Sequence, residues 1–65
     1  MRYKIEYLAV AVVVHTKTPF GAIITDVATE ARKGGATAKT LFGANSFRIR
    51  DMNDAGKIVA SEMIA

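Results

Sequence analysis

Cysteine and tryptophan are absent from this chain of 65 residues, and proline and histidine occur once each. Without cysteine there is no disulfide, and the Cys/His clusters of a structural zinc site are missing as well. A domain of this length gains little net stability from its own core, because apolar burial and ordering entropy nearly cancel. We therefore expect a single domain over residues 1–65 that packs efficiently or buries surface against another chain.

The shortage of reactive side chains argues against catalysis. A nucleophile and base pair would have to use His15, which we interpret as an exposed residue beside a loop. Residues 51–62 match part of the spacing of an EF-hand calcium loop, but its fifth position is Ala55, which has no ligand oxygen. We expect no enzyme activity, no metal and no cofactor.

The apolar run from Leu8 to Val14 is far shorter than the ~20 residues that a membrane-spanning helix needs. A signal peptide is not expected either. Glu6 lies where such a peptide is positively charged, and no small-residue cleavage site follows His15. We expect no membrane association and a cytoplasmic location.

The N-terminal segment is rich in apolar and β-branched residues. Over residues 2–15 the odd positions from Tyr3 to Val13 are all apolar, and the even positions become apolar from Leu8 onward, which predicts one long strand. A helix on a sheet of this size covers only one sheet face, so a second apolar face predicts a partner. We assign self-association, most simply as a homodimer, to Leu8, Val10, Val12 and Val14.

The helix has two possible positions. Apolar residues at helical spacing, after Thr18 as N-cap and Pro19 as first residue, predict a helix over residues 19–33. The β-branched stretch 22–27 instead predicts a second strand, which moves the helix to residues 29–42. We favour the second position.

In the favoured position the helix ends at Gly43, and its inward side is a stripe of small residues. These small residues allow the helix to approach the sheet closely. The predicted stripe consists of Ala31, Gly35, Ala38 and either Leu41 or Phe42.

The C-terminal third predicts a β-hairpin. Residues 46–52 alternate, with Phe47 and Ile49 on one face and Arg48 and Arg50 on the other. Residues 53–56 have the Asn, Asp and Gly of a turn, and residues 57–64 form the returning strand. The fold class is therefore α+β, a small antiparallel sheet with one helix packed on one face. The order is ββαββ or, alternatively, βαββ.

The net charge of +3 permits weak attraction to nucleic acid but does not require it. Phe47 lies on the opposite strand face from Arg48 and Arg50, so an aromatic platform for stacking bases is missing. We interpret the arginines as part of a polar sheet face on which one of them pairs with Glu62. The candidate contacts for a partner protein, or for nucleic acid, are Arg32, Lys33, Arg48 and Arg50.

The segment AKTLFGANSFRIRDMNDAGKIVASE, residues 38–62, resembles small orphan proteins of phages and mobile elements, some of them similar to anti-CRISPR or other host-directed inhibitors. The resemblance implies a protein that binds a macromolecule and blocks it, and it implies no particular functional residue. We expect a non-catalytic, homo-oligomeric protein-interaction module that occludes a partner protein. The alternative is a small basic nucleic-acid-binding protein.

Overall fold

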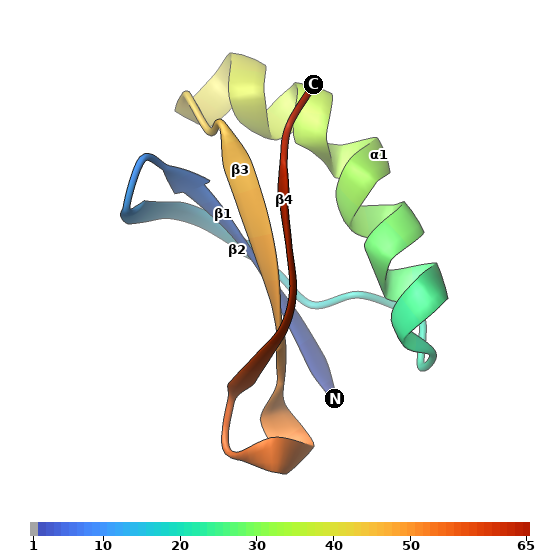
Figure 1. The fold of residues 1–65 in the computed structure, drawn as a ribbon. Coiled ribbons are helices and arrows are strands. Elements are labelled where there is room, and N and C mark those ends of the chain that lie inside the picture. The colour runs from blue at the N-terminus through green and yellow to red at the C-terminus, as the bar shows by residue number, and fades with distance from the viewer. Residues whose placement is uncertain (1) are drawn as a thin grey trace.

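The computed structural model describes residues 2–65 and shows one antiparallel sheet with a helix packed on one of its faces (Figure 1). The strands lie in the order β2-β1-β3-β4. The predicted α+β class and the order ββαββ are confirmed. The elements are β1 (Tyr3–Ala9), β2 (Val12–Lys17), α1 (Ile24–Phe42), β3 (Ser46–Asp51), a short 3-10 turn (Met52–Asp54) and β4 (Lys57–Met63).

The central pair of strands, β1 and β3, comes from distant parts of the chain. Their register places Ile5 opposite Ile49 and Tyr7 opposite Phe47. All four side chains are buried in the core beneath α1. Because side chains alternate between the two faces of a strand, the residues between them lie on the face that no helix covers.

The N-terminal segment is a hairpin, so the prediction of one strand over residues 2–15 is wrong. The chain turns at Val10 and Ala11, and Val10 has a φ of 58°, in the left-handed region that β-branched residues rarely adopt. The Val10 amide donates a hydrogen bond to Oδ1 of Asn45 at 3.0 Å. The turn is therefore stabilised by a contact with a residue far along the chain. The local sequence contains no glycine or asparagine that would predict it.

The helix overlaps both predicted ranges. It begins at Ile24, after the extended residue Ile23, so the predicted strand over residues 22–27 is wrong. Val27 is fully buried on the inward side of the helix, and its burial outweighs the local β preference of this stretch. The predicted end at Gly43 is confirmed, since Gly43 has a φ of 72° and donates its amide hydrogen to the carbonyl of Lys39.

The inward stripe of small helix residues is confirmed at Ala31, Gly35 and Ala38, whereas Leu41 and Phe42 are largely exposed. The stripe allows a close approach at two points. The Tyr7 hydroxyl donates a hydrogen bond to the carbonyl of Ala31 at 2.7 Å, and a Cβ atom at Gly34 would lie 2.5 Å from that hydroxyl oxygen. A Cβ at Gly35 would lie 3.3 Å from Ile64.

The predicted C-terminal hairpin is confirmed, and a carboxylate stabilises its turn. Asp51 accepts a hydrogen bond from the Asn53 amide at 3.0 Å and pairs with Arg2 at 3.0 Å. The hydrogen bond from Arg2 holds the pKa of Asp51 below its usual value. Between Ile58 and Ala60, β4 contains one extra residue relative to β3, so the register shifts at this bulge.

Gly34→Ala should destabilise the fold although alanine is the better helix former by about 1 kcal/mol. The new methyl group displaces the Tyr7 hydroxyl, and we expect a net loss of roughly 1–2 kcal/mol in the free energy of unfolding, measured by urea denaturation. In the Tyr7→Phe background the same substitution should cost less, because the hydroxyl oxygen is gone. Equal costs in both backgrounds would contradict this explanation.

Candidate functional site

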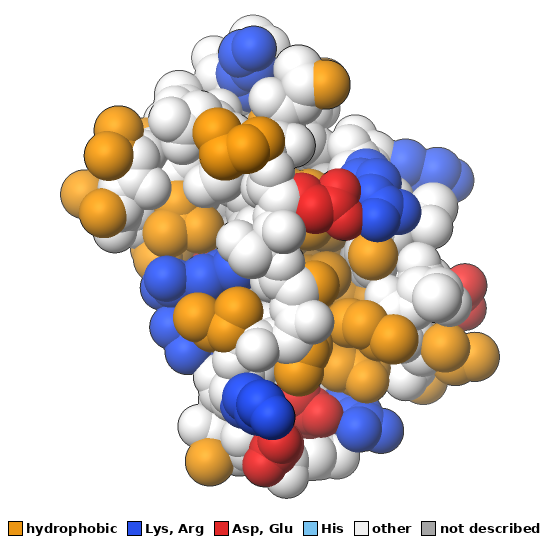
Figure 2. Space-filling view, in the orientation of Figure 1, with side chains coloured by type: hydrophobic (Ala, Val, Ile, Leu, Met, Phe, Trp, Pro, Cys, Tyr) orange, Lys and Arg blue, Asp and Glu red, His pale blue; other side chains and the backbone are white. Residues whose placement is uncertain are grey.

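The sheet face opposite α1 carries a charged cluster at its centre. We call Lys4 and Glu6 of β1 and Arg48 and Arg50 of β3 the arginine face; three basic groups and one carboxylate leave it positively charged. Figure 2 shows basic side chains beside exposed apolar ones along the left side of the view. The face is therefore a mixture of cationic and apolar surface.

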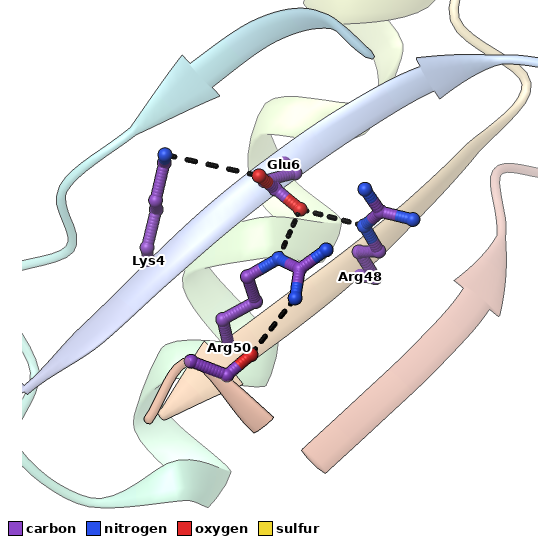
Figure 3. A network of polar contacts seen from close by, with 5 residues as sticks. Lys4, Glu6, Arg48 and Arg50 are labelled. Atoms are coloured by element: carbon purple, nitrogen blue, oxygen red, sulfur yellow. Dashed lines mark hydrogen bonds and ion pairs between the residues drawn. The ribbon is translucent and has the colours of Figure 1, made fainter. Parts of the chain in front are cut away.

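Glu6 is the centre of this cluster. Its side chain is 9% exposed, and its Oε1 atom accepts hydrogen bonds from Nε of Arg48 at 2.6 Å and from Nε of Arg50 at 2.7 Å (Figure 3). The Lys4 ammonium lies 3.8 Å from Oε2. One nearly buried carboxylate therefore holds two guanidinium groups in place side by side.

The terminal nitrogens of the two arginines are only partly used. Nη1 of Arg50 donates to the carbonyl of Gly56 at 2.8 Å. Among the hydrogen bonds within residues 2–65, none uses either terminal nitrogen of Arg48 or Nη2 of Arg50. Both side chains remain partly exposed, so these N–H groups are available to an anionic group outside the chain.

The charge state of Glu6 maintains this arrangement. Burial raises the pKa of Glu6, but the hydrogen bonds and positive charges of Arg48 and Arg50 together outweigh burial, so the pKa lies below its ordinary value. Glu6 is therefore ionised at neutral pH. The two arginines are held by charge-assisted hydrogen bonds, which are stronger than neutral ones.

The structure divides the four predicted basic contacts into two pairs. Arg48 and Arg50 lie together on the arginine face, whereas Arg32 and Lys33 belong to α1, on the other side of the sheet. Arg32 donates hydrogen bonds to both carboxylate oxygens of Glu62.

The predicted pairing of Arg48 or Arg50 with Glu62 is wrong. Glu62 lies opposite Phe47 in the sheet, on the face toward α1, where Arg32 reaches it. The true partner, Glu6, was not recognised from the sequence. The only local feature that distinguishes Glu6 is that it is the one acidic residue among the polar even positions before Leu8.

The residues predicted for self-association do not share one surface. Leu8 is buried, Val10 is exposed in the hairpin turn, Val12 is exposed at the start of β2, and Val14 packs against the core. The hairpin explains this separation, because it places the second half of the segment beside the first. A continuous apolar face over these four residues does not exist.

His15 lies in β2 and is half-buried, so its interpretation as an exposed residue beside a loop is wrong. Its ring stacks on Phe42 at a centroid distance of 4.6 Å and lies 6.0 Å from the ring of Tyr7. Within the described part of the chain, no three His, Asp or Glu side chains gather where they could hold a metal ion. His15 therefore contributes to packing between β2 and the end of α1.

Comparison with known proteins gives no family: no protein-family model, curated protein or solved structure matches the chain. Within residues 2–65, no helix is long and apolar enough to cross a membrane. The fold and the arginine face together define a small α+β domain with a preorganised cationic sheet face.

Glu6→Gln should reduce the free energy of unfolding by roughly 1–3 kcal/mol at neutral pH, because it weakens hydrogen bonds to two partly buried guanidinium groups. The folded-state pKa of Glu6 is lowered, so its contribution is present above the ordinary value of 4.5 and disappears as the pH falls through the folded pKa. Urea denaturation at neutral and acidic pH measures the difference. Glu62→Gln, at a more exposed ion pair, is the control and should cost less. A pH-independent difference for Glu6→Gln would contradict the assignment.

Proposed function

We propose that this protein is a non-catalytic binding module whose arginine face binds an acidic surface of a partner protein and thereby covers it. The observation that carries the proposal is the Glu6 carboxylate, which fixes Arg48 and Arg50 side by side through their Nε atoms and leaves three of their four terminal nitrogens without a hydrogen bond within residues 2–65. Guanidinium groups bind carboxylates through paired N–H donors, and holding them in place beforehand reduces the entropy lost on binding.

The free-energy cost of burying this charged cluster supports a role in binding. A nearly buried carboxylate with two arginines is seldom more stable than apolar residues of similar size. At the centre of an uncovered sheet face, valine or threonine would pack at least as well. The charged cluster is better explained by what its free donors bind than by stability.

The shape of the surface favours a macromolecule. Small-molecule sites are concave, whereas the arginine face is the outer surface of a sheet. Three open hollows in the structure are all lined in part by α1, and neither Arg48 nor Arg50 contributes to any of them. A broad partner surface fits the arginine face better than a small ligand does.

The surroundings of the arginines favour a protein over nucleic acid. On the same sheet face the partly exposed Val13 lies opposite the buried Leu8, and the exposed Met63 lies next to them across Ser46. Arginine combined with apolar side chains is typical of protein interfaces, whereas nucleic-acid interfaces are more strongly positive.

The positions of the aromatic residues also favour a protein partner over nucleic acid. Tyr3, Tyr7 and Phe47 are buried beneath α1, so they cannot stack on bases at the arginine face. The proposal also retains self-association of the chain and action in the cytoplasm, both expected from the sequence.

The experiment compares partner capture from nuclease-treated extract of the source cell by three forms of the protein. These are the wild type, the double variant Arg48→Ala/Arg50→Ala, and the charge-matched control Lys33→Ala/Lys39→Ala on the exposed side of α1. We expect the control to retain the captured protein. The arginine variant should bind the purified partner at least about tenfold more weakly, because truncating an interface arginine leaves its anionic partner unpaired.

Equal binding by both double variants would refute the proposal. Capture of the partner from untreated extract but not from nuclease-treated extract would also refute the proposal and would favour the nucleic-acid alternative. A steep fall of affinity for single-stranded DNA or RNA with rising salt identifies that alternative directly.

A further inference from the structure

The strand β4 forms one edge of the sheet, and within residues 2–65 no other strand covers its outer side. Most of its side chains are exposed, including the apolar Ile58, Val59 and Met63. An edge strand presents unpaired backbone N–H and C=O groups, which readily accept another strand.

The charges of β4 fit a second copy of β4. Lys57 is its first residue, and Glu62 lies near its other end. When two identical strands pair antiparallel around a twofold axis, the beginning of each lies opposite the end of the other. The opposite edge, β2, carries His15 and Lys17 without any acidic residue, so it has no such complementarity with itself.

The bulge in β4 allows Lys57 of one copy to face Glu62 of the other on the same side of the sheet. Residues that face each other in an antiparallel pair must lie on the same side of the sheet. Lys57 lies opposite Asp51 and Glu62 opposite Phe47, and these two β3 residues share the face toward α1. In a regular strand, residues 57 and 62 would point to opposite faces, and the extra residue at Val59 brings them to the same one.

The same register also covers apolar surface. It places Ile58 opposite Ser61 of the second copy, and both lie on the face away from α1. Met63 of the second copy is then the diagonal neighbour of Ile58, close enough for contact between long side chains. These two side chains are 45% and 72% exposed in the single chain.

We propose that two copies of this chain pair through β4, with Lys57 of each opposite Glu62 of the other. The two four-stranded sheets join into one, with both helices on one face and both arginine faces on the other. This inference supplies an interface for the self-association included in the proposed function. It uses none of the arginine-face residues, so either proposal can fail alone.

A charge exchange tests the pairing. Lys57→Glu places like charges opposite each other twice in the dimer and should raise its dissociation constant about tenfold or more, measured by sedimentation equilibrium. Glu62→Lys should weaken self-association in the same way. A mixture of the two variants should form heterodimers more tightly than either variant self-associates, because every facing pair across the interface is again of opposite charge, although Glu62→Lys also removes the partner of Arg32 within its own chain.

Lys17→Glu on β2 is the matched control and should leave the dimer unchanged. A wild-type protein that stays monomeric at all accessible concentrations would overturn the inference. A Lys17→Glu effect as large as that of Lys57→Glu, or a mixture that fails to associate, would do so as well.

Disulfide trapping tests the register directly, since the chain has no cysteine of its own. Under mild oxidation, Lys57→Cys mixed with Glu62→Cys should give a crosslinked heterodimer in high yield, because facing Cβ atoms lie within disulfide reach. Lys57→Cys mixed with Met63→Cys, one position out of register, is the control and should crosslink poorly. Equal yields in the two mixtures would refute the proposed register.

Discussion

The antiparallel register of β1 on β3 is the constraint on which both the core and the arginine face depend. It places Tyr7 opposite Phe47 beneath α1 and, one residue earlier on β1, Glu6 opposite Arg48 on the uncovered face. A slip of one residue would move every side chain of β1 to the other face, exposing aromatic rings and burying the charged ones. The apolar core and the ion cluster therefore specify the same register from opposite sides of the sheet.

A single helix can cover only one face of a four-stranded sheet, and this limit explains why a polar face exists at all. The contact that sets the distance between the layers is the hydrogen bond from Tyr7 to the carbonyl of Ala31, with Gly34 leaving room for the hydroxyl group. The small inward side chains of α1 bring it close to the central strands. The opposite face has no such cover, and there a carboxylate organises two arginines.

The two proposed surfaces have different physical bases. The arginine face offers fixed cationic donors on a flat surface, whereas the β4 edge offers unpaired backbone groups with complementary charges at its two ends. In the proposed dimer, both arginine faces lie on one side of the joined sheet. A partner with two acidic sites would then bind both copies, and the second contact would form at a high effective concentration.

The features that could be predicted from the sequence are those that short-range chemistry controls. These are the α+β class, the helix end at Gly43, and the C-terminal hairpin in which Phe47 and Arg48 point to opposite faces. Three features could not be predicted: the turn at Val10, the start of the helix, and the pairing of Glu6 with arginines 42 and 44 residues away. These features depend on contacts between segments that are far apart in the sequence. In addition, an alternating apolar pattern is equally compatible with one long strand and with two strands joined by a turn.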